Sequence, residues 1–270
     1  MNQPKISVIM GIYNCEATLS EAIDSIISQT YTNWELIMCD DGSTDETYKV
    51  AELYRVQYPQ KIKLLRNTRN MKLSYTLNQC LGAASGELIA RMDGDDVSDC
   101  ERLQKQVDYL QSNPEIHLVG TSMQCFDDSG RHSIRVPVKN PNPLTLRDRT
   151  PFFHATIMTY KWVYDALGGY SDDPHAERTE DIELWFRFFN QGFKGANMDE
   201  VLYYVREDYE TIKRRTTLNR INNFRIRAWG FRLLGFPKRW LLKLALLTVI
   251  KILVPPCFVK WIRQYQGYMG

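Results

Sequence analysis

The sequence predicts an α/β protein whose sheet is mostly parallel and is covered by helices on both faces. Short apolar runs alternate with amphipathic stretches through the first 125 residues, which is typical of repeated strand–helix units. With 270 residues, 44% of them apolar and 12% aromatic, the chain is long enough to bury a substantial core. A sharp change in charge near residue 210 separates this α/β region from a basic C-terminal extension.

Each predicted strand of the first half is a short apolar run, the first of which reads Ile-Ser-Val-Ile-Met. We expect these strands at residues 6–10, 35–39, 62–65, 87–92 and 117–125. The stretches between them have apolar residues at helical spacing, as in Leu19, Ala22, Ile23 and Ile26. We therefore expect helices at residues 19–29, 44–58, 74–84 and 101–111, the last of them stopped by Asn113-Pro114.

Net charge divides the chain into two parts. The whole chain has 34 Lys plus Arg and 32 Asp plus Glu, which gives a net charge of +2. All 32 acidic residues lie in residues 1–210, where 21 basic residues leave a net charge of −11. Residues 211–270 have 13 basic residues and no acidic residue. We therefore predict an acidic α/β domain over residues 1–210 and a basic helical extension over residues 211–270 that meets an anionic partner.

Carboxylates follow two of the predicted strands at the point where each strand ends. Asp40 and Asp41 follow one strand, and Asp93, Asp95 and Asp96 follow another. In a parallel sheet these ends lie at one rim, which is where ligands bind. Carboxylates that lie close together repel unless a cation offsets them, and carboxylate oxygens are the ligands that Mg²⁺ and Mn²⁺ prefer. A turn followed by a helix N-cap remains the alternative for residues 43–46.

Several nucleotide-binding and hydrolase classes are disfavoured by missing motifs. The first strand–helix junction lacks the G-x-G-x-x-G pattern of dinucleotide-binding folds. The sequence also has no G-x-x-x-x-G-K-[ST] phosphate loop and no G-x-S-x-G nucleophile elbow. The acidic rim is therefore the main chemical signal of the α/β region.

Five motifs, in this order, resemble those of the family 2 inverting glycosyltransferases. They are Ser7 to Asn14, Ser28-Gln29-Thr30, Asp40 to Asp45, Gly86 to Ile89 and Asp93-Gly94-Asp95-Asp96. The resemblance covers residues 4–210 and implies the GT-A fold. Residues 1–125 would form the nucleotide-sugar half, and residues 126–210 would form the acceptor half. One departure is Gly11-Ile12, because the family commonly has a Pro two residues before the Tyr.

The resemblance also implies where the donor would bind. The nucleotide-binding residues would be Gly11, Ile12, Tyr13, Asn14, Asp41, Lys72 and Asp93. Tyr13 and the backbone before it would hold the base, and Asp41 would accept a hydrogen bond from the N–H edge of that base. The metal, Mn²⁺ or Mg²⁺, would be held by Asp95, Asp93 and His154, with Asp96 alongside. For Lys72 an exposed loop position is the alternative, and for His154 it is a hydrogen-bonded core residue.

The resemblance assigns the catalytic base to Asp181. An inverting transfer needs a carboxylate that takes the proton from the attacking hydroxyl. The segment from Thr179 to Trp185 also reads as an ordinary helix start, with Thr179 as N-cap and acidic residues in the first turn. Glu180 and Trp185 would line the acceptor site, although a tryptophan in the core is the alternative for Trp185.

The basic extension combines charge with an apolar run. Residues 209–234 read as a helix, and residues 241–254 form an apolar run that contains Lys243 and Lys251. This run is too short and too charged to span a bilayer, so we predict helices that lie in the plane of an anionic membrane surface. Packing on the catalytic domain or a homodimer seam is the alternative. A nucleic-acid partner is disfavoured, since no recognised binding motif is present.

Together, these observations predict a metal-dependent inverting glycosyltransferase. We expect it to move one sugar from a UDP-hexose or UDP-N-acetylhexosamine to a lipid-linked saccharide during O-antigen or capsule biosynthesis. It would work peripherally at the cytoplasmic face of the inner membrane, and Lys213, Arg214 and Arg215 would close over the donor. The alternatives are a GDP-, TDP- or CDP-linked donor, and a catalytically silent nucleotide-sugar-binding or scaffold protein.

Overall fold

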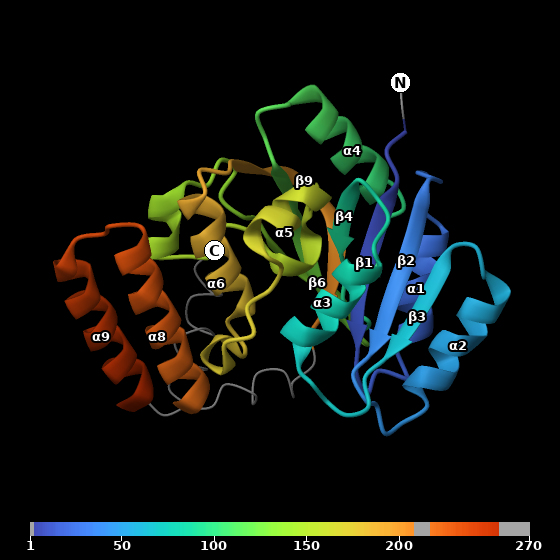
Figure 1. Ribbon diagram of the computed structural model, residues 1–270, viewed down its shortest axis with the longest axis horizontal. Helices are drawn as coiled ribbons and strands as arrows, with labels where there is room; N and C mark the ends of the chain where they lie inside the picture. Colours follow the sequence, from blue (N-terminus) through green and yellow to red (C-terminus); the bar gives the residue numbers. More distant parts are fainter. Residues whose placement is uncertain (1–2, 208–216, 254–270) are drawn as a thin grey trace.

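A computed structural model describes residues 3–207 and 217–253 of the chain. One nine-stranded sheet runs through it in the order β3-β2-β1-β4-β8-β6-β9-β5, and β7 pairs with β6 (Figure 1). The four strands at one end are all parallel: β1 (Ile6–Ile12), β2 (Trp34–Asp40), β3 (Ile62–Arg66) and β4 (Leu88–Arg91). Helices α1 (Leu19–Ile27), α2 (Thr47–Gln57), α3 (Leu73–Ala83) and α4 (Arg102–Ser112) follow in turn. Every strand and helix predicted for the first half is present, within three residues of its predicted bounds.

The second half continues the same sheet with mixed strand directions. Its strands are β5 (Val97–Ser98), β6 (Leu118–Asp127), β7 (Gly130–Arg135), β8 (Met158–Tyr160) and β9 (Gly195–Arg206). Strand β8 pairs antiparallel with both β4 and β6, so it joins the two halves. The other elements are α5 (Lys161–Leu167), α6 (Glu180–Asn190) and the 3₁₀ turns η1 (Pro143–Arg147), η2 (His154–Thr156) and η3 (Pro174–Ala176). The α/β class is confirmed.

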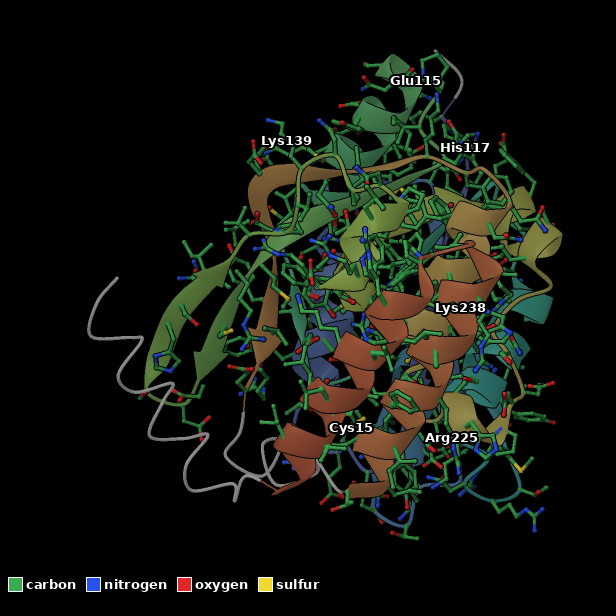
Figure 2. The ribbon with its side chains drawn as sticks, turned by 90° about the vertical axis from the view of Figure 1, so that its left-hand side faces the viewer. Cys15, Glu115, His117, Lys139, Arg225 and Lys238 are labelled. Atoms are coloured by element: carbon green, nitrogen blue, oxygen red, sulfur yellow. The ribbon has the colours of Figure 1, made fainter. Side chains whose placement is uncertain are left out.

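The described part of the basic extension is a pair of helices packed on the α/β domain. Helices α8 (Thr217–Leu233) and α9 (Lys238–Leu253) lie side by side, with Arg225 and Lys238 toward opposite ends of the pair (Figure 2). Helix α8 crosses α6 so closely that a Cβ on Gly230 would lie 2.2 Å from Cγ of Phe186. None of the helices described is long and apolar enough to cross a membrane.

Helix α9 has one packed side and one exposed apolar side. Trp240, Leu241 and Leu244 pack against the core cluster that includes α6 and α8. The exposed side presents Leu242, Leu246, Leu247, Val249 and Ile250. Packing on the catalytic domain, the alternative to a membrane role, is therefore observed for one side of α9 only. The start of the predicted helix at residue 209 lies outside the described residues.

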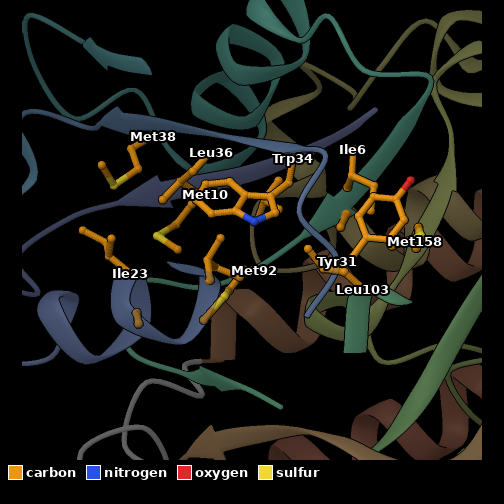
Figure 3. Close-up of a cluster of buried hydrophobic side chains, with 14 of the residues drawn as sticks. Ile6, Met10, Ile23, Tyr31, Trp34, Leu36, Met38, Met92, Leu103 and Met158 are labelled. Atoms are coloured by element: carbon orange, nitrogen blue, oxygen red, sulfur yellow. The ribbon is translucent and has the colours of Figure 1, made fainter. Parts of the chain in front are cut away.

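Two hydrophobic cores lie on the two faces of the sheet. Along β1, Ile6, Val8 and Met10 face one core, and Ile9 faces the other, as the alternation of a strand requires. The first core packs the sheet against α1, α2 and α4 (Figure 3). The second packs it against α3, α5, α6 and α8. Because both faces are covered, the polar ends of the strands are left as the place for a site.

Candidate active site

The carboxylates that follow β4 form a compact cluster. Ligand oxygens of Asp93, Asp95 and Asp96 all lie within 4.8 Å of one another. Asp93 is half-buried, Asp95 is exposed and Asp96 is buried. This is the one group of potential metal ligands found among the residues that the structure describes, and it does not include His154.

Asp93 is held by a buried arginine. The guanidinium of Arg91, which is 4% exposed, forms two contacts with the Asp93 carboxylate at 2.5 and 2.6 Å. Burial is the largest single effect and disfavours the charge on Arg91, but Asp93 together with the neighbouring Tyr203, Tyr170 and Asp96 outweighs it and keeps the pKa of Arg91 above its usual value. Arg91 therefore offsets the charge of Asp93 and fixes its orientation.

Asp96 is held by residues of β9. Its carboxylate accepts hydrogen bonds from the Tyr203 hydroxyl at 2.9 Å and from the backbone N–H of Arg206 at 2.8 Å. Burial, together with the charges of Asp93 and Asp95, raises the pKa of Asp96 well above its usual value. The Tyr203 hydroxyl also accepts from the backbone N–H of Asp93 at 3.1 Å, so one tyrosine fixes both ends of the acidic loop.

The donor set of this cluster suits one divalent ion. Carboxylate oxygens are the preferred ligands of Mg²⁺ and Mn²⁺, and three carboxylates so close together need cationic compensation. Arg91 supplies part of that compensation at Asp93, and Asp96 is enclosed by Tyr203 and Arg206. Asp95 is the carboxylate that faces outward, so it is the best placed to hold an ion together with a ligand's phosphate oxygens.

The end of β1 meets the loop after β2 through the side chain of Asn14. The side-chain Oδ1 of Asn14 accepts from the backbone N–H of Thr44 at 2.9 Å. The backbone N–H of Asn14 donates to Ser43 Oγ at 3.0 Å. Asn14 has a φ of 47°, and Tyr13 before it is 46% exposed just after the end of β1. The Ile12 side chain is buried, so this residue presents only its backbone to a ligand.

Asp41 organises the loop that precedes α3. Its carboxylate accepts from the side chain of Asn67 at 2.8 Å and from the backbone N–H groups of Met71 at 2.7 Å and Lys72 at 3.0 Å. A carboxylate has about four lone-pair sites, so one acceptor position is left for the edge of a base. The Lys72 ammonium lies 3.3 Å from Glu177, which links this loop to the acceptor half.

Two carboxylates begin helix α6. Burial and the charge of Asp181 raise the pKa of Glu180 to about 7. Burial also raises the pKa of Asp181, although Arg227 and Arg91 oppose this effect. Thr179 occupies the N-cap position, as the alternative of an ordinary helix start expected, but its hydroxyl donates to the carbonyl of Ala176 and does not cap the helix. An acid with a raised pKa is suited to proton transfer near neutral pH.

His154 and Trp185 lie among aromatic groups. The Nε2 atom of His154 is 2.7 Å from the Tyr170 hydroxyl, which is 2.8 Å from the Tyr164 hydroxyl. Burial and the nearby Arg91 lower the pKa of His154 well below its usual value. Trp185 is fully buried and contacts Phe152, so stacking on an acceptor sugar is ruled out and the core alternative holds. His154 is likewise a hydrogen-bonded residue outside the carboxylate cluster.

The loop before η3 is held by the side chain of Asn78 from α3. Its Nδ2 donates to the Tyr170 carbonyl at 2.9 Å, and its Oδ1 accepts from the Tyr170 N–H at 2.8 Å. Gly169, with a φ of 74°, lies so close that a Cβ there would be 2.6 Å from that Oδ1. This amide pairing attaches the acceptor-half loop directly to a helix of the nucleotide half.

Sequence reasoning missed the groups that hold the acidic loop in place. Arg91 and Tyr203 are the main examples, along with the Asn78 pairing. One available signal was an arginine inside the apolar run before Asp93, because a charged residue in a buried strand needs a partner. Nothing local marks Tyr203, which is 107 residues from Asp96. The predicted lid residues Lys213, Arg214 and Arg215 lie outside the described residues.

The fold and the acidic rim define an α/β protein with a candidate metal site at the carboxyl ends of its strands, and comparison with known proteins supplies the family. The model of glycosyl transferase family 2 matches residues 7–165. EpsE of Bacillus subtilis (strain 168), whose name describes a glycosyltransferase, is 49% identical over 82% of this chain and 79% of its own length. The chain therefore belongs to glycosyl transferase family 2.

Two further relatives have names that state an enzymatic activity. AmsE of Erwinia amylovora, an amylovoran biosynthesis glycosyltransferase, is 31% identical over 80% of this chain and 82% of its own. An Escherichia coli enzyme is named UDP-Gal:alpha-D-GlcNAc-diphosphoundecaprenol beta-1,3-galactosyltransferase. It is 31% identical over 78% of this chain and 78% of its own.

Solved structures share the fold. S. aureus TarS 1-349 in complex with UDP-GlcNAc superposes with a TM-score of 0.66 at 19% identity, covering 84% of this chain and 66% of that one. The mannosyltransferase PcManGT from Pyrobaculum calidifontis, in complex with GDP-Man and Mn²⁺, gives 0.63 at 18% identity, covering 99% and 81%. At such identities the likeness concerns the fold alone, and it agrees with the predicted GT-A class.

Proposed function

We propose that this glycosyltransferase moves one sugar from a UDP-hexose or UDP-N-acetylhexosamine to a hydroxyl of a lipid-linked saccharide, with inversion, in the biosynthesis of a surface polysaccharide such as O-antigen or capsule. The observation that carries the proposal is the position of Arg91. It pairs directly with Asp93, and its positive charge also acts on Glu180 and Asp181, where it partly opposes the rise in pKa that burial causes. The donor-side carboxylates and the candidate base therefore share one buried cation, as the two sides of a single reaction centre would.

Asp181 is proposed as the general base. Its carboxylate accepts the proton of the acceptor hydroxyl while the oxygen attacks the anomeric carbon from the face opposite the leaving group. The new carbon–oxygen bond forms as the bond to the nucleoside diphosphate breaks. Burial raises the pKa of Asp181 toward the pH at which a general base works best. Glu180 lies beside it, with a pKa of about 7.

On the donor side, Tyr13 and the remaining acceptor position of Asp41 would hold the base, and Asp93 would face the ribose and diphosphate. Asp95 would hold Mn²⁺ or Mg²⁺, with Asp93 and Asp96 beside it. The ion supplies Lewis-acid stabilisation of the charge that develops on the leaving diphosphate. Arg91 keeps Asp93 oriented, and the Tyr203 hydroxyl holds the loop between Asp93 and Asp96 in place.

The names of relatives support the choice of substrates. A UDP-linked donor and an acceptor made of N-acetylglucosamine on diphosphoundecaprenol both appear in the name of the E. coli galactosyltransferase. A second E. coli relative, 40% identical over 42% of this chain, has a name with UDP-Glc and the same acceptor. AmsE is named for the synthesis of a polysaccharide.

We propose that the enzyme acts at a membrane surface. The exposed leucine, valine and isoleucine side chains of α9 lie on a helix that begins with Lys238-Arg239, within a segment of 13 basic and no acidic residues. Apolar side chains and basic residues together favour peripheral binding to anionic headgroups. We place the enzyme at the cytoplasmic face of the inner membrane, where a lipid-linked acceptor and a nucleotide sugar meet.

Calorimetric titration of UDP tests the donor site. We expect micromolar binding with Mn²⁺ and a loss of at least about 10-fold with chelator or in Asp95→Ala, because an ion held by Asp95 would offset the charge of the diphosphate. Asp181→Asn is the matched variant, since it should bind UDP as the wild type does yet transfer no sugar. Binding of GDP, TDP or CDP in place of UDP would refute the donor assignment. Full turnover by Asp181→Asn would refute the base.

A further inference from the structure

A cavity of about 480 Å³ lies between helix α8 and the segment around η3. This volume falls in the range of small-ligand sites, about 300–1,000 Å³. The residues that decide its chemistry are Asp173, His175, Glu183, Arg225, Trp229 and Arg232. None of them was singled out from the sequence.

The cavity is lined by two arginines and two acids, and Arg187 from outside the lining offsets the charge of one acid, Glu183. Arg225 donates to the His175 ring at 3.2 Å and has no acidic partner among residues 3–207 and 217–253. Arg232 has no partner of any kind within the same residues. The acids of the cavity are already engaged, since Asp173 accepts from the backbone of His175 at 2.8 Å and Glu183 pairs with Arg187 at 2.6 Å. Within the described part of the chain, the two arginines of α8 are therefore the cavity's cations without an acidic partner, as the binding of an anion requires.

The spacing along α8 places these groups on one face. Residues 225, 229 and 232 are four and then three positions apart, so they lie one above the other. Trp229 is 38% exposed, and its ring contacts Phe186 edge-on with centroids 6.3 Å apart. An indole face suits a sugar ring, and guanidinium groups bind phosphate through paired N–H donors. This combination matches a phosphorylated saccharide.

The position of the cavity fits an acceptor. Glu183, which lines it, lies on α6 two residues after the candidate base Asp181, so the cavity borders the helix that carries the base but on a different face of that helix. Arg225 lies at the same end of the molecule as Cys15, which follows β1 at the rim of the sheet (Figure 2). Helix α9, with its exposed apolar side, packs beside α8. An acceptor lipid could therefore follow α9 while its headgroup enters the cavity.

We propose that this cavity is the acceptor subsite for the diphosphate of a lipid-linked saccharide, with Arg225 and Arg232 on the phosphate oxygens and Trp229 against a sugar ring. The inference rests on the proposed function and adds to it the place where the acceptor is recognised. The same phosphate chemistry occurs in the headgroups of anionic lipids, so the experiment must separate these two sources.

The probe is N-acetylglucosamine diphosphate on a short, water-soluble alkyl chain. It is titrated calorimetrically into the full chain with saturating UDP and Mn²⁺, which occupy the donor site. The same titration with an alkyl N-acetylglucosaminide that lacks phosphate measures the contribution of the diphosphate. We expect Arg225→Gln/Arg232→Gln to weaken binding of the diphosphate probe about 10-fold or more, because charge-assisted hydrogen bonds are lost. Binding of the phosphate-free glycoside should stay within about twofold.

Lys238→Gln/Arg239→Gln is the matched control. It removes the same charge from exposed positions at the start of α9, outside the cavity. We expect it to leave binding of the diphosphate probe unchanged and to reduce cosedimentation with phosphatidylglycerol vesicles. The cavity variant should retain vesicle binding. Equal losses of probe binding in the two variants, or a cavity variant that loses only vesicle binding, would overturn the proposal.

Measuring sugar transfer to the diphosphate probe distinguishes a failure of the proposed subsite from a failure of the proposed function. If the wild type binds the diphosphate probe through these arginines but transfers no sugar to it, the subsite stands and the acceptor class of the reaction is wrong. If the cavity variant transfers sugar with an unchanged KM for the probe, the reaction stands and the subsite is wrong.

Discussion

Glu180 should make the stability of the protein depend on pH between about 4.5 and about 7, and Glu180→Gln should remove that dependence. Burial and the charge of Asp181 raise its pKa from 4.5 to about 7. The folded protein therefore holds the Glu180 proton more tightly than the unfolded chain does. Its contribution to the free energy of unfolding is largest below about pH 4.5 and is lost as the pH rises through about 7.

The size of the effect follows from the two pKa values. A tenfold difference in proton affinity is worth about 1.4 kcal/mol, so the full difference corresponds to about 3 kcal/mol. Glu180 is only partly buried, and solvent screening reduces this to about 2 kcal/mol. Glutamine has nearly the same shape without the charge. Relative to the wild type, Glu180→Gln should gain about 2 kcal/mol at pH 8 and almost nothing at pH 4.5.

Urea denaturation at pH 4.5, 6 and 8 measures this difference directly, because the free energy of unfolding is obtained at each pH under one set of conditions. The matched control is Glu177→Gln. Glu177 is exposed and forms a surface pair with Lys72, so its loss should change stability by less than about 0.5 kcal/mol at every pH. A gain in Glu180→Gln that is the same at pH 4.5 and pH 8 would refute the reasoning.

Two further changes test the packing and the buried ion pair. Gly230→Ala places a methyl group against Phe186 and should cost about 1–3 kcal/mol by denaturation, whereas Gly82→Ala on α3 meets no atom within 4 Å and should stabilise by about 0.5–1 kcal/mol. If the two variants changed the free energy of unfolding equally, α8 would be able to move away from α6 at no cost. Arg91→Met leaves the half-buried Asp93 without its cation and should cost about 3 kcal/mol; a loss below about 1 kcal/mol would mean that water replaces the pair.

The first half of the fold could be predicted because its signals are local. Strands such as Ile6–Ile12 are apolar runs, and helices such as α1 have apolar residues at helical spacing. Strands β5 and β8 have two and three residues, so only their partners define them. The same limit applies to α9, where the sequence pattern did not distinguish the side packed on the protein from the exposed side.

The candidate site was also predictable only in part, where its signals are local in the sequence. Asp93, Asp95 and Asp96 could be placed together from the strand that precedes them. The groups that hold them could not, since Tyr203 comes from a strand more than 100 residues away. Trp185 illustrates the opposite error, because an aromatic residue four positions after a candidate base reads equally well as a sugar platform or as core. Burial, which decides between these interpretations, is a property of the folded chain.

The pairing of Asn78 with Tyr170 has a consequence for how new specificities arise. The side-chain amide bonds only to the main-chain N–H and C=O of residue 170, in the way that a neighbouring strand would. This main-chain attachment does not depend on side chains within the loop, provided that residue 169 remains glycine, and the buried Tyr170 ring is the second anchor that must be kept. A loop of different sequence could be grafted between α5 and α6 and still be anchored. The segment between residue 170 and α6 can thus vary in sequence while its attachment to α3 is kept.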